Sequence, residues 1–227
     1  MANASQTDRA RALQCLTTAI YYEAAREPDD GQRAVAQVVL NRVRHPAFPS
    51  TVCGVVFQGS EKRGCQFSFA CDGAMTRGQP ARDAWIRAAR VAADALNGSV
   101  FAPVGMATHY HTYAVTPSWN RSLVMTGVFG AHFFHRWKGY WGTSAAFRSV
   151  YAGHEPFPGP HPSLAVASPA LPVPATGRAA MATPVPIQVQ PAYAQSGAPV
   201  APKVAQQDDN SGSQILDKWK DSGKPLR

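Results

Sequence analysis

The sequence contains no long hydrophobic run. No stretch of about 18 apolar residues occurs in its 227 residues, which excludes a transmembrane helix. The opening segment MANASQTDRARALQ lacks the apolar core of a secretory signal peptide. Clusters such as KKRK and zinc-finger or RNA-binding signatures are also missing, so we expect no nucleic-acid partner. These absences predict a soluble protein, and we expect it to be a monomer.

Large apolar side chains are scarce in the last third of the chain. Residues 155–227 hold 13 of the 19 prolines, and such a composition buries too little surface to offset the entropy of ordering. We therefore expect a folded domain over residues 8–154 and a disordered Pro/Ala-rich tail over residues 155–227. Residues 1–154 carry 16 basic and 9 acidic side chains, so the domain surface favours polyanions.

Helical patterns dominate the folded part. Asp8 is suited to cap a first helix that ends near Arg26, before Pro28. Apolar spacing predicts two more helices over about 31–44 and 81–96. A cysteine-rich loop spans residues 49–79, and short extended pieces follow at 104–115 and 128–141. The pattern predicts an α+β fold that is mainly α, with short β segments.

The apolar stripe of the first helix ends in a carboxylate. Leu13, Leu16 and Ile20 follow helical spacing, and Glu23 is the next residue on that face. Apolar neighbours disfavour the charged form, so the pKa of Glu23 should rise toward the range of a general acid. The alternative is that Glu23 lies at the rim and pairs with Arg26 or Arg42.

Two further carboxylates are candidates for a second catalytic group. Glu27 lies four residues after Glu23 on the same helix face, where it repels that charge or simply ends the helix in solvent beside Pro28. Asp72 lies in the cysteine-rich loop, where an Asp-Gly turn is the ordinary interpretation. Either group could hold a water for hydrolysis.

Several ordered sequence blocks resemble one known family. They are AIYYEAAREP at 19–28, GQRAVAQVVLNRV at 31–43, FPSTVCGVVFQ at 48–58, QFSF at 66–69, Asp72-Gly73, ATHYH at 107–111, Pro117, Trp119 and GAHFF at 130–134. Together they resemble the SleB/CwlJ-type cell wall hydrolases, the spore-cortex-lytic enzyme family. The resemblance covers about residues 15–135 and leaves out the tail.

The resemblance implies a lysozyme-like domain related to resuscitation-promoting factors and lytic transglycosylases. Peptidoglycan would be the substrate, and Glu23 would protonate the oxygen between N-acetylmuramic acid and N-acetylglucosamine. Where the family usually has E-A-R-G-E, this chain has Glu23-Ala24-Ala25-Arg26-Glu27, with the second Glu kept in place. No acidic residue lies between Asp94 and Glu155, which suits a one-carboxylate lytic transglycosylase without a cofactor.

Aromatic and polar residues of the same blocks are candidates for sugar binding. Flat rings pack on pyranose rings, although most aromatic residues are buried for their area. The expected substrate-binding residues are Tyr22, Asn41, Phe67, Ser68, Thr108, His109, Tyr110, His111, Trp119 and His132.

Two alternatives to glycan cleavage remain open, a zinc enzyme that uses the histidines and a binding module of the same fold. His109 and His111 alternate along an extended piece, while His132 and His135 are spaced one helical turn apart. Together with Asp72, these four imidazoles could form a zinc site. Such a site would indicate a peptidoglycan amidase or peptidase, but HExxH is missing and we expect no metal. The other alternative is a wall-binding module without turnover.

The four cysteines indicate disulfide bonds and therefore the cellular compartment of the protein. Three pairings are open, and the short step from Cys65 to Cys71 suggests one loop-closing bond that leaves Cys15 for Cys53. Disulfides and a wall substrate predict a periplasmic or wall-associated protein, although no export signal is visible.

Overall fold

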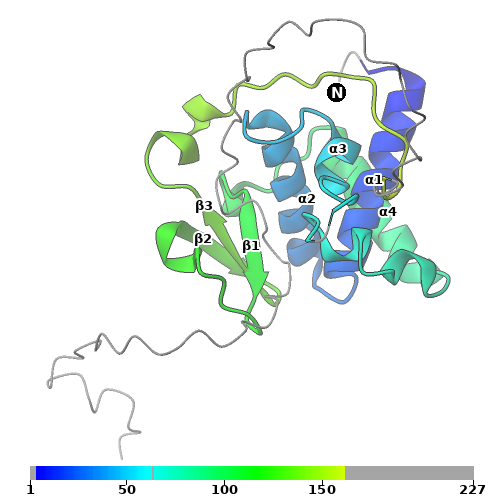
Figure 1. The fold of residues 1–227 in the computed structure, drawn as a ribbon, viewed down its shortest axis with the longest axis horizontal. Coiled ribbons are helices and arrows are strands. Elements are labelled where there is room, and N and C mark those ends of the chain that lie inside the picture. The colour runs from blue at the N-terminus through cyan, green and yellow to red at the C-terminus, as the bar shows by residue number, and fades with distance from the viewer. Residues whose placement is uncertain (1–3, 63, 162–227) are drawn as a thin grey trace, which may run out of the picture.

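A computed structural model describes residues 4–62 and 64–161 (Figure 1). Its helices are α1 (Gln6–Ala24), α2 (Asp29–Arg44), α3 (Val52–Val56) and α4 (Arg82–Leu96), and its strands are β1 (His109–Thr112), β2 (Val124–Phe129) and β3 (His132–Arg136). The prediction of a mainly helical α+β fold is confirmed. Within these residues, no helix combines the length and apolar character that crossing a bilayer requires.

Helix α1 begins earlier than the sequence pattern predicted. Ser5 is the N-cap, and its hydroxyl accepts the Asp8 N–H at 3.0 Å and donates to the Asp8 carboxylate at 2.7 Å. The assignment of Asp8 as the cap was therefore wrong. This residue lies in the first turn of the helix, where its carboxylate holds the hydroxyl of the capping residue Ser5. At the other end, Pro28 separates α1 from α2 as expected.

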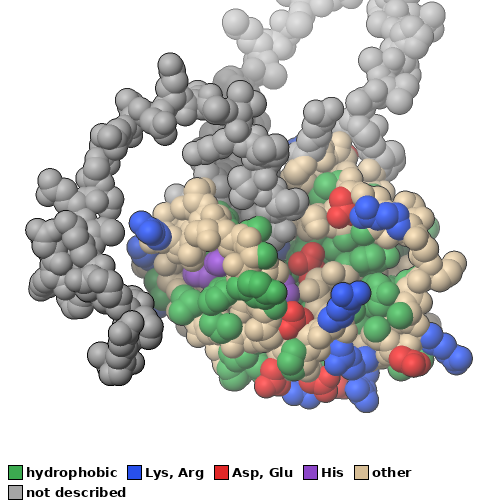
Figure 2. Space-filling model, turned by 90° about the horizontal axis from the view of Figure 1, so that it is seen from below, with side chains coloured by type: hydrophobic (Ala, Val, Ile, Leu, Met, Phe, Trp, Pro, Cys, Tyr) green, Lys and Arg blue, Asp and Glu red, His purple; other side chains and the backbone are tan. Residues whose placement is uncertain are grey.

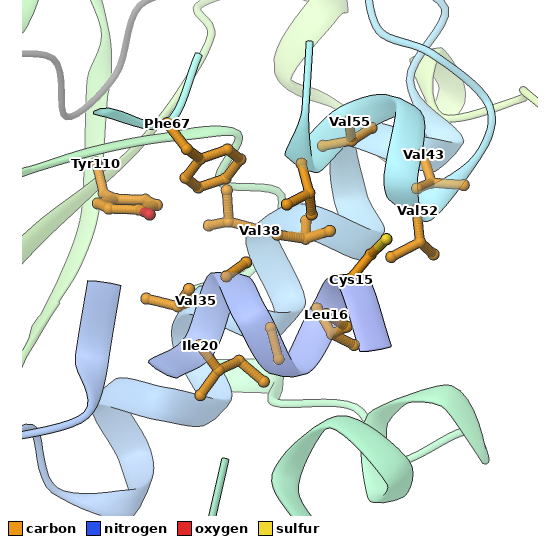
Figure 3. Close-up of a cluster of buried hydrophobic side chains, with 14 of the residues drawn as sticks. Cys15, Leu16, Ile20, Val35, Val38, Val43, Val52, Val55, Phe67 and Tyr110 are labelled. Carbon is orange, nitrogen blue, oxygen red and sulfur yellow. The ribbon is translucent and has the colours of Figure 1, made fainter. Parts of the chain in front are cut away.

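The core is formed mainly by the helices. Helix α1 packs on α2, α3 and α4. In Figure 3, Leu16 and Ile20 of α1 face Val35 and Val38 of α2, while Tyr110 lies at one side of the cluster. Because Glu23 follows Ile20 by one turn of the same helix, this packing brings its side chain to the edge of the core, next to Tyr110.

Helix α3 lies inside the segment that the sequence assigned to a loop. Thr51 caps it by accepting the Gly54 N–H, and the Cys15–Cys53 disulfide ties it to α1. A second disulfide, Cys65–Cys71, closes the loop around residues 66–70. The suggested pairings are confirmed. Five residues are too few for a clear helical period, which explains why the pattern missed α3.

The three strands form an antiparallel sheet in the order β1-β3-β2. The register pairs Tyr110 with Phe134 and His109 with His135. Alternation along β3 therefore places His132 on the face of Tyr110 and His135 on the opposite face. The interpretation of His132 and His135 as one helical turn apart was wrong, because this segment is a strand and residues three apart in a strand point to opposite sides.

After the sheet, the chain crosses back to the helices (yellow-green in Figure 1). We call residues 148–161 the C-terminal strap. The Ser149 and Ala152 amides bond to the carbonyls of Arg44 and Ser50, so the strap runs along the end of α2 and the start of α3.

Glu155 is the main anchor of the C-terminal strap. Its side chain is 1% exposed, and its two carboxylate oxygens accept the N–H groups of Val52 and Cys53, each at 2.8 Å. Its own N–H donates to Asp8. The expected domain boundary after residue 154 is thus too early, because residue 155 satisfies amides of the helical core. The expected tail from residue 162 onward lies outside the described residues.

Candidate active site

Glu23 lies in the last turn of α1 and is partly exposed. The hydroxyl of Tyr110, from β1, donates a hydrogen bond to Glu23 Oε2 at 3.0 Å. Tyr110 itself is 1% exposed, so its ring is fixed by packing and its hydroxyl is directed at the carboxyl. Helix and sheet therefore meet at this carboxyl.

Burial raises the pKa of Glu23 from its ordinary 4.5 to about 7. The Tyr110 hydroxyl and the Arg42 guanidinium act in the opposite direction, since both favour the ionised form, while the charge of Asp72 adds to the increase. A carboxyl with this pKa is protonated in a large fraction of molecules near neutral pH. Glu23 is therefore suited to donate a proton there.

Arg42 is a buried cation that the sequence suggested only as a rim partner. It is 0% exposed, its Nε donates to the Thr108 carbonyl at 2.7 Å, and its guanidinium lies 5.3 Å from the ring centre of Phe48 and 5.2 Å from that of Phe67. Burial lowers its pKa to about 10, so it remains charged at neutral pH. The sequence feature that could have revealed this burial is the position of Arg42 on the apolar, buried face of α2.

Glu27 lies just after α1 and contacts the turn between β2 and β3. Its Oε2 accepts the Ala131 N–H at 2.9 Å, and its Oε1 lies 3.8 Å from His132 Nδ1. Burial lowers the pKa of His132, while the charge of Glu27 raises it. Both oxygens of this carboxylate thus face groups of the protein.

Asp72 forms the Asp-Gly turn that was the ordinary interpretation of its sequence. The carboxylate accepts the Ala74 N–H at 2.7 Å and pairs with Arg77 at 3.2 Å, and Gly73 follows in the left-handed conformation with φ of 80°. Asp72 is exposed and acts on Glu23 through its charge.

Three of the expected binding residues remain close to this site. Tyr22, next to Glu23, stacks on Phe69 with ring centres 5.0 Å apart and is partly exposed, as is Ser68. His132 places its ring at 88° to that of Tyr110, 5.1 Å away, but is buried.

Other expected binding residues are part of the framework instead. The Asn41 side-chain amide donates to the carbonyls of Gly105 and Ala107, and its oxygen accepts from Gln37, so its hydrogen-bonding capacity is occupied. The Thr108 hydroxyl bonds to His109 Nδ1. Asn41, Phe67, Thr108, His109 and Trp119 are all buried, and direct substrate contact stays a prediction for them.

The histidines do not converge on one point. His111 is buried and stacks between Phe133 and His135 on one face of the sheet, whereas His132 lies on the other. Within residues 4–62 and 64–161, no group of three His, Cys, Asp or Glu side chains is arranged to hold a metal ion. The sheet thus separates His132 from His109, His111 and His135, which share its other face.

The molecular surface reflects this arrangement. Figure 2 shows acidic and histidine side chains gathered along the groove where the lobe of the sheet meets the helices, with Lys or Arg side chains beside them. Glu23, from the end of α1, and Glu27, just beyond it, come from this junction.

Known proteins resemble part of this chain, and the range matched by the family model begins three residues after Glu23. A protein-family model described as Cell Wall Hydrolase matches residues 26–135. The chain is 38% identical over 125 residues to a spore cortex-lytic enzyme of Halalkalibacterium halodurans, covering 54% of this chain and 34% of that protein. A Bacillus cereus spore cortex-lytic enzyme is 35% identical over 125 residues, covering 54% of this chain and 43% of that protein. The match thus spans less than half of these curated relatives.

Among solved structures, the catalytic domain of the Bacillus cereus SleB protein is 33% identical, covering 59% of this chain and 93% of that domain, with a TM-score of 0.46. The catalytic domain of SleB from Bacillus anthracis is also 33% identical and is covered over 98% of its length, with the same TM-score. The match of the family model to residues 26–135 places this segment of the chain in the cell wall hydrolase family.

Proposed function

We propose that this protein cleaves the glycan strand of peptidoglycan between N-acetylmuramic acid and N-acetylglucosamine, as a lytic transglycosylase that uses Glu23 as acid and base. The observation that carries this proposal is the environment of Glu23. This carboxyl combines a pKa of about 7, partial access to solvent and a fixed hydroxyl donor on one oxygen. The spore cortex-lytic relatives support a wall substrate.

In the first step, Glu23 donates its proton to the glycosidic oxygen while the bond from that oxygen to the muramyl C1 breaks. The carboxylate that remains is stabilised by the Tyr110 hydroxyl at 3.0 Å and by the positive charge of Arg42. Because Tyr110 donates to Oε2, we assign the transferred proton to Oε1. In the second step, the muramyl C6 hydroxyl attacks C1 and returns its proton to Glu23.

The other two carboxylates favour this one-carboxylate mechanism over hydrolysis. A hydrolase needs a second carboxyl about 5–9.5 Å from the first to act as nucleophile or to activate water. Glu27 accepts an amide and faces His132, and Asp72 is engaged by Ala74 and Arg77. An intramolecular hydroxyl removes the need for such a group.

Mass spectrometry of the soluble products from purified peptidoglycan tests the proposal. We compare wild type, Glu23→Gln and, as a matched carboxylate control, Asp72→Asn, each with and without a chelator. Wild type and Asp72→Asn should release 1,6-anhydromuropeptides that the chelator does not affect. Glu23→Gln should release none, because glutamine has no proton of suitable acidity to donate.

The other outcomes contradict the proposal in separate ways. Reducing-end muropeptides that require Glu23 would indicate hydrolysis with a positioned water. Stem peptides released only without chelator would indicate a metal-dependent amidase or peptidase. Binding of peptidoglycan with no products from the wild type would indicate a wall-binding module.

We further propose that the protein acts in the periplasm or at the wall. The two disulfides, Cys15–Cys53 and Cys65–Cys71, favour an oxidising compartment, since thiols are kept reduced in the cytosol of most bacteria. The expectation of a monomer stays a prediction.

A further inference from the structure

Glu27 joins the end of α1 to the sheet. It belongs to the segment between α1 and α2, yet its Oε2 accepts the amide proton of Ala131, at the turn between β2 and β3 and 104 residues further along the chain, at 2.9 Å. Its side chain is 15% exposed. Because the Glu27 carboxylate is shielded from solvent and accepts a backbone N–H of the turn, it fixes the position of the turn relative to the helices.

Two glycines make room for this carboxylate. A Cβ atom on Gly130 would overlap Glu27 Oε2, and one on Gly31 would lie 2.8 Å from Glu27 Cβ. Gly130 also has φ of 60°, where side chains are disfavoured. The close approach of Glu27 to the turn therefore depends on both chain segments lacking a side chain.

The turn is connected to Glu23 by two successive contacts. Ala131 precedes His132 in β3, and the ring of His132 packs edge-on against Tyr110 at 5.1 Å. Tyr110 is also paired with Phe134 of β3, with ring centres 5.4 Å apart. A shift of the β2–β3 turn would thus move the neighbours of Tyr110, whose hydroxyl donates to Glu23.

We propose that Glu27 is a positioning residue: by holding the Ala131 amide it fixes β3 against β1 and so aligns the Tyr110 hydroxyl with Glu23. This role rests on the proposed function of Glu23. It differs from that of a second catalytic carboxylate, because it needs a hydrogen-bond acceptor at Oε2 and not a base. An uncharged acceptor of the same shape should serve it.

The variants Glu27→Gln and Glu27→Ala separate these roles. On soluble glycan strands, Glu27→Gln should keep kcat within about threefold of wild type, since its amide oxygen still accepts the Ala131 N–H. Glu27→Ala should lower kcat by about 10- to 100-fold at nearly unchanged KM, the size expected when a catalytic group is misplaced by about 1 Å. The Tyr110 13Cζ resonance, which reports the hydrogen bond of the hydroxyl, should move in the alanine variant only.

Gly130→Ala provides a steric test from the other side of the contact. Its methyl group should displace Glu27 and lower kcat as Glu27→Ala does, and the two changes combined should cost little more than either alone. Gly139→Ala is the matched control, because Gly139 has the same φ of 60° but no atom within 4 Å of the added Cβ. It should leave kcat and the Tyr110 resonance unchanged.

Three results would overturn the proposal. Equal loss of kcat in Glu27→Gln and Glu27→Ala would indicate a charged or catalytic role. A lower melting temperature with unchanged kcat and Tyr110 resonance in Glu27→Ala would indicate a structural role alone. Lost activity without a change of the Tyr110 resonance would rule out the route through Tyr110. If even the wild type is inactive, the resonance still tests the alignment, and only the proposed function fails.

Discussion

Replacing Glu23 by glutamine should stabilise the folded protein at about pH 8 and change its stability little at about pH 4. The pKa of Glu23 is about 7 in the folded protein and near 4.5 in an ordinary exposed carboxyl. The folded state therefore binds the proton more tightly than the unfolded state. Stability falls as the pH rises from 4.5 to 7, and glutamine, which never ionises, does not show this loss.

The size of the effect follows from the difference between the two pKa values. Each pKa unit corresponds to about 1.4 kcal/mol, so the full difference gives an upper value of about 3.4 kcal/mol above pH 7. Because the carboxyl is partly exposed, solvent screens its charge and we expect about 2–3 kcal/mol. For a domain of this size, that raises the melting temperature by roughly 5–10 °C.

Thermal unfolding followed by circular dichroism, for both proteins from about pH 4 to pH 8, measures this difference directly. The two melting curves should coincide in acid and separate as the pH passes through the pKa of Glu23. A constant difference across the pH range, or a Glu23→Gln variant that is less stable at pH 8, would refute the reasoning that burial governs this carboxyl.

Two further predictions concern the neighbours of Glu23 and the disulfides. Tyr110→Phe removes the donor that lowers the pKa of Glu23, so the alkaline limb of the pH–rate profile should move upward by about 1–2 pH units, and an unmoved limb would contradict the assigned bond. Replacing Cys15 and Cys53 by alanine opens a 38-residue loop and should lower the free energy of unfolding by about 4 kcal/mol. Replacing Cys65 and Cys71, whose loop spans 6 residues, should lower it by about 2 kcal/mol. Unfolding in urea measures both losses. Equal losses would contradict the loop-length argument.

The helical framework and the position of Glu23 could be predicted from the sequence, because both depend on local spacing. The stripe through Leu16 and Ile20 predicted that Glu23 would meet the core, and the structure agrees. Helix boundaries were less accurate, since the start of α1 depends on Ser5, three residues before the residue that the pattern selected.

Features that depend on contacts between distant segments were not predictable in this way. The amide that Glu27 accepts belongs to Ala131, and the polar groups of Asn41 are used by the backbone at residues 105 and 107. A single sequence shows that these side chains are polar but not where their partners lie. The wrong assignment of the His132 and His135 spacing has a related cause, because three-residue spacing brings side chains together on a helix and separates them on a strand.

The C-terminal strap has a consequence for where this protein can be cut. The family match ends at residue 135, but the amides that begin α3 find their acceptors in Glu155, and Asp8 near the start of α1 holds the same residue. A fragment that ends at residue 135 would lack Glu155 and leave the Val52 and Cys53 N–H groups without their acceptor, at a cost of about 1–3 kcal/mol each. The folded unit therefore extends beyond both ends of the segment that the family model matches, because Glu155 joins the start of α1 to the start of α3.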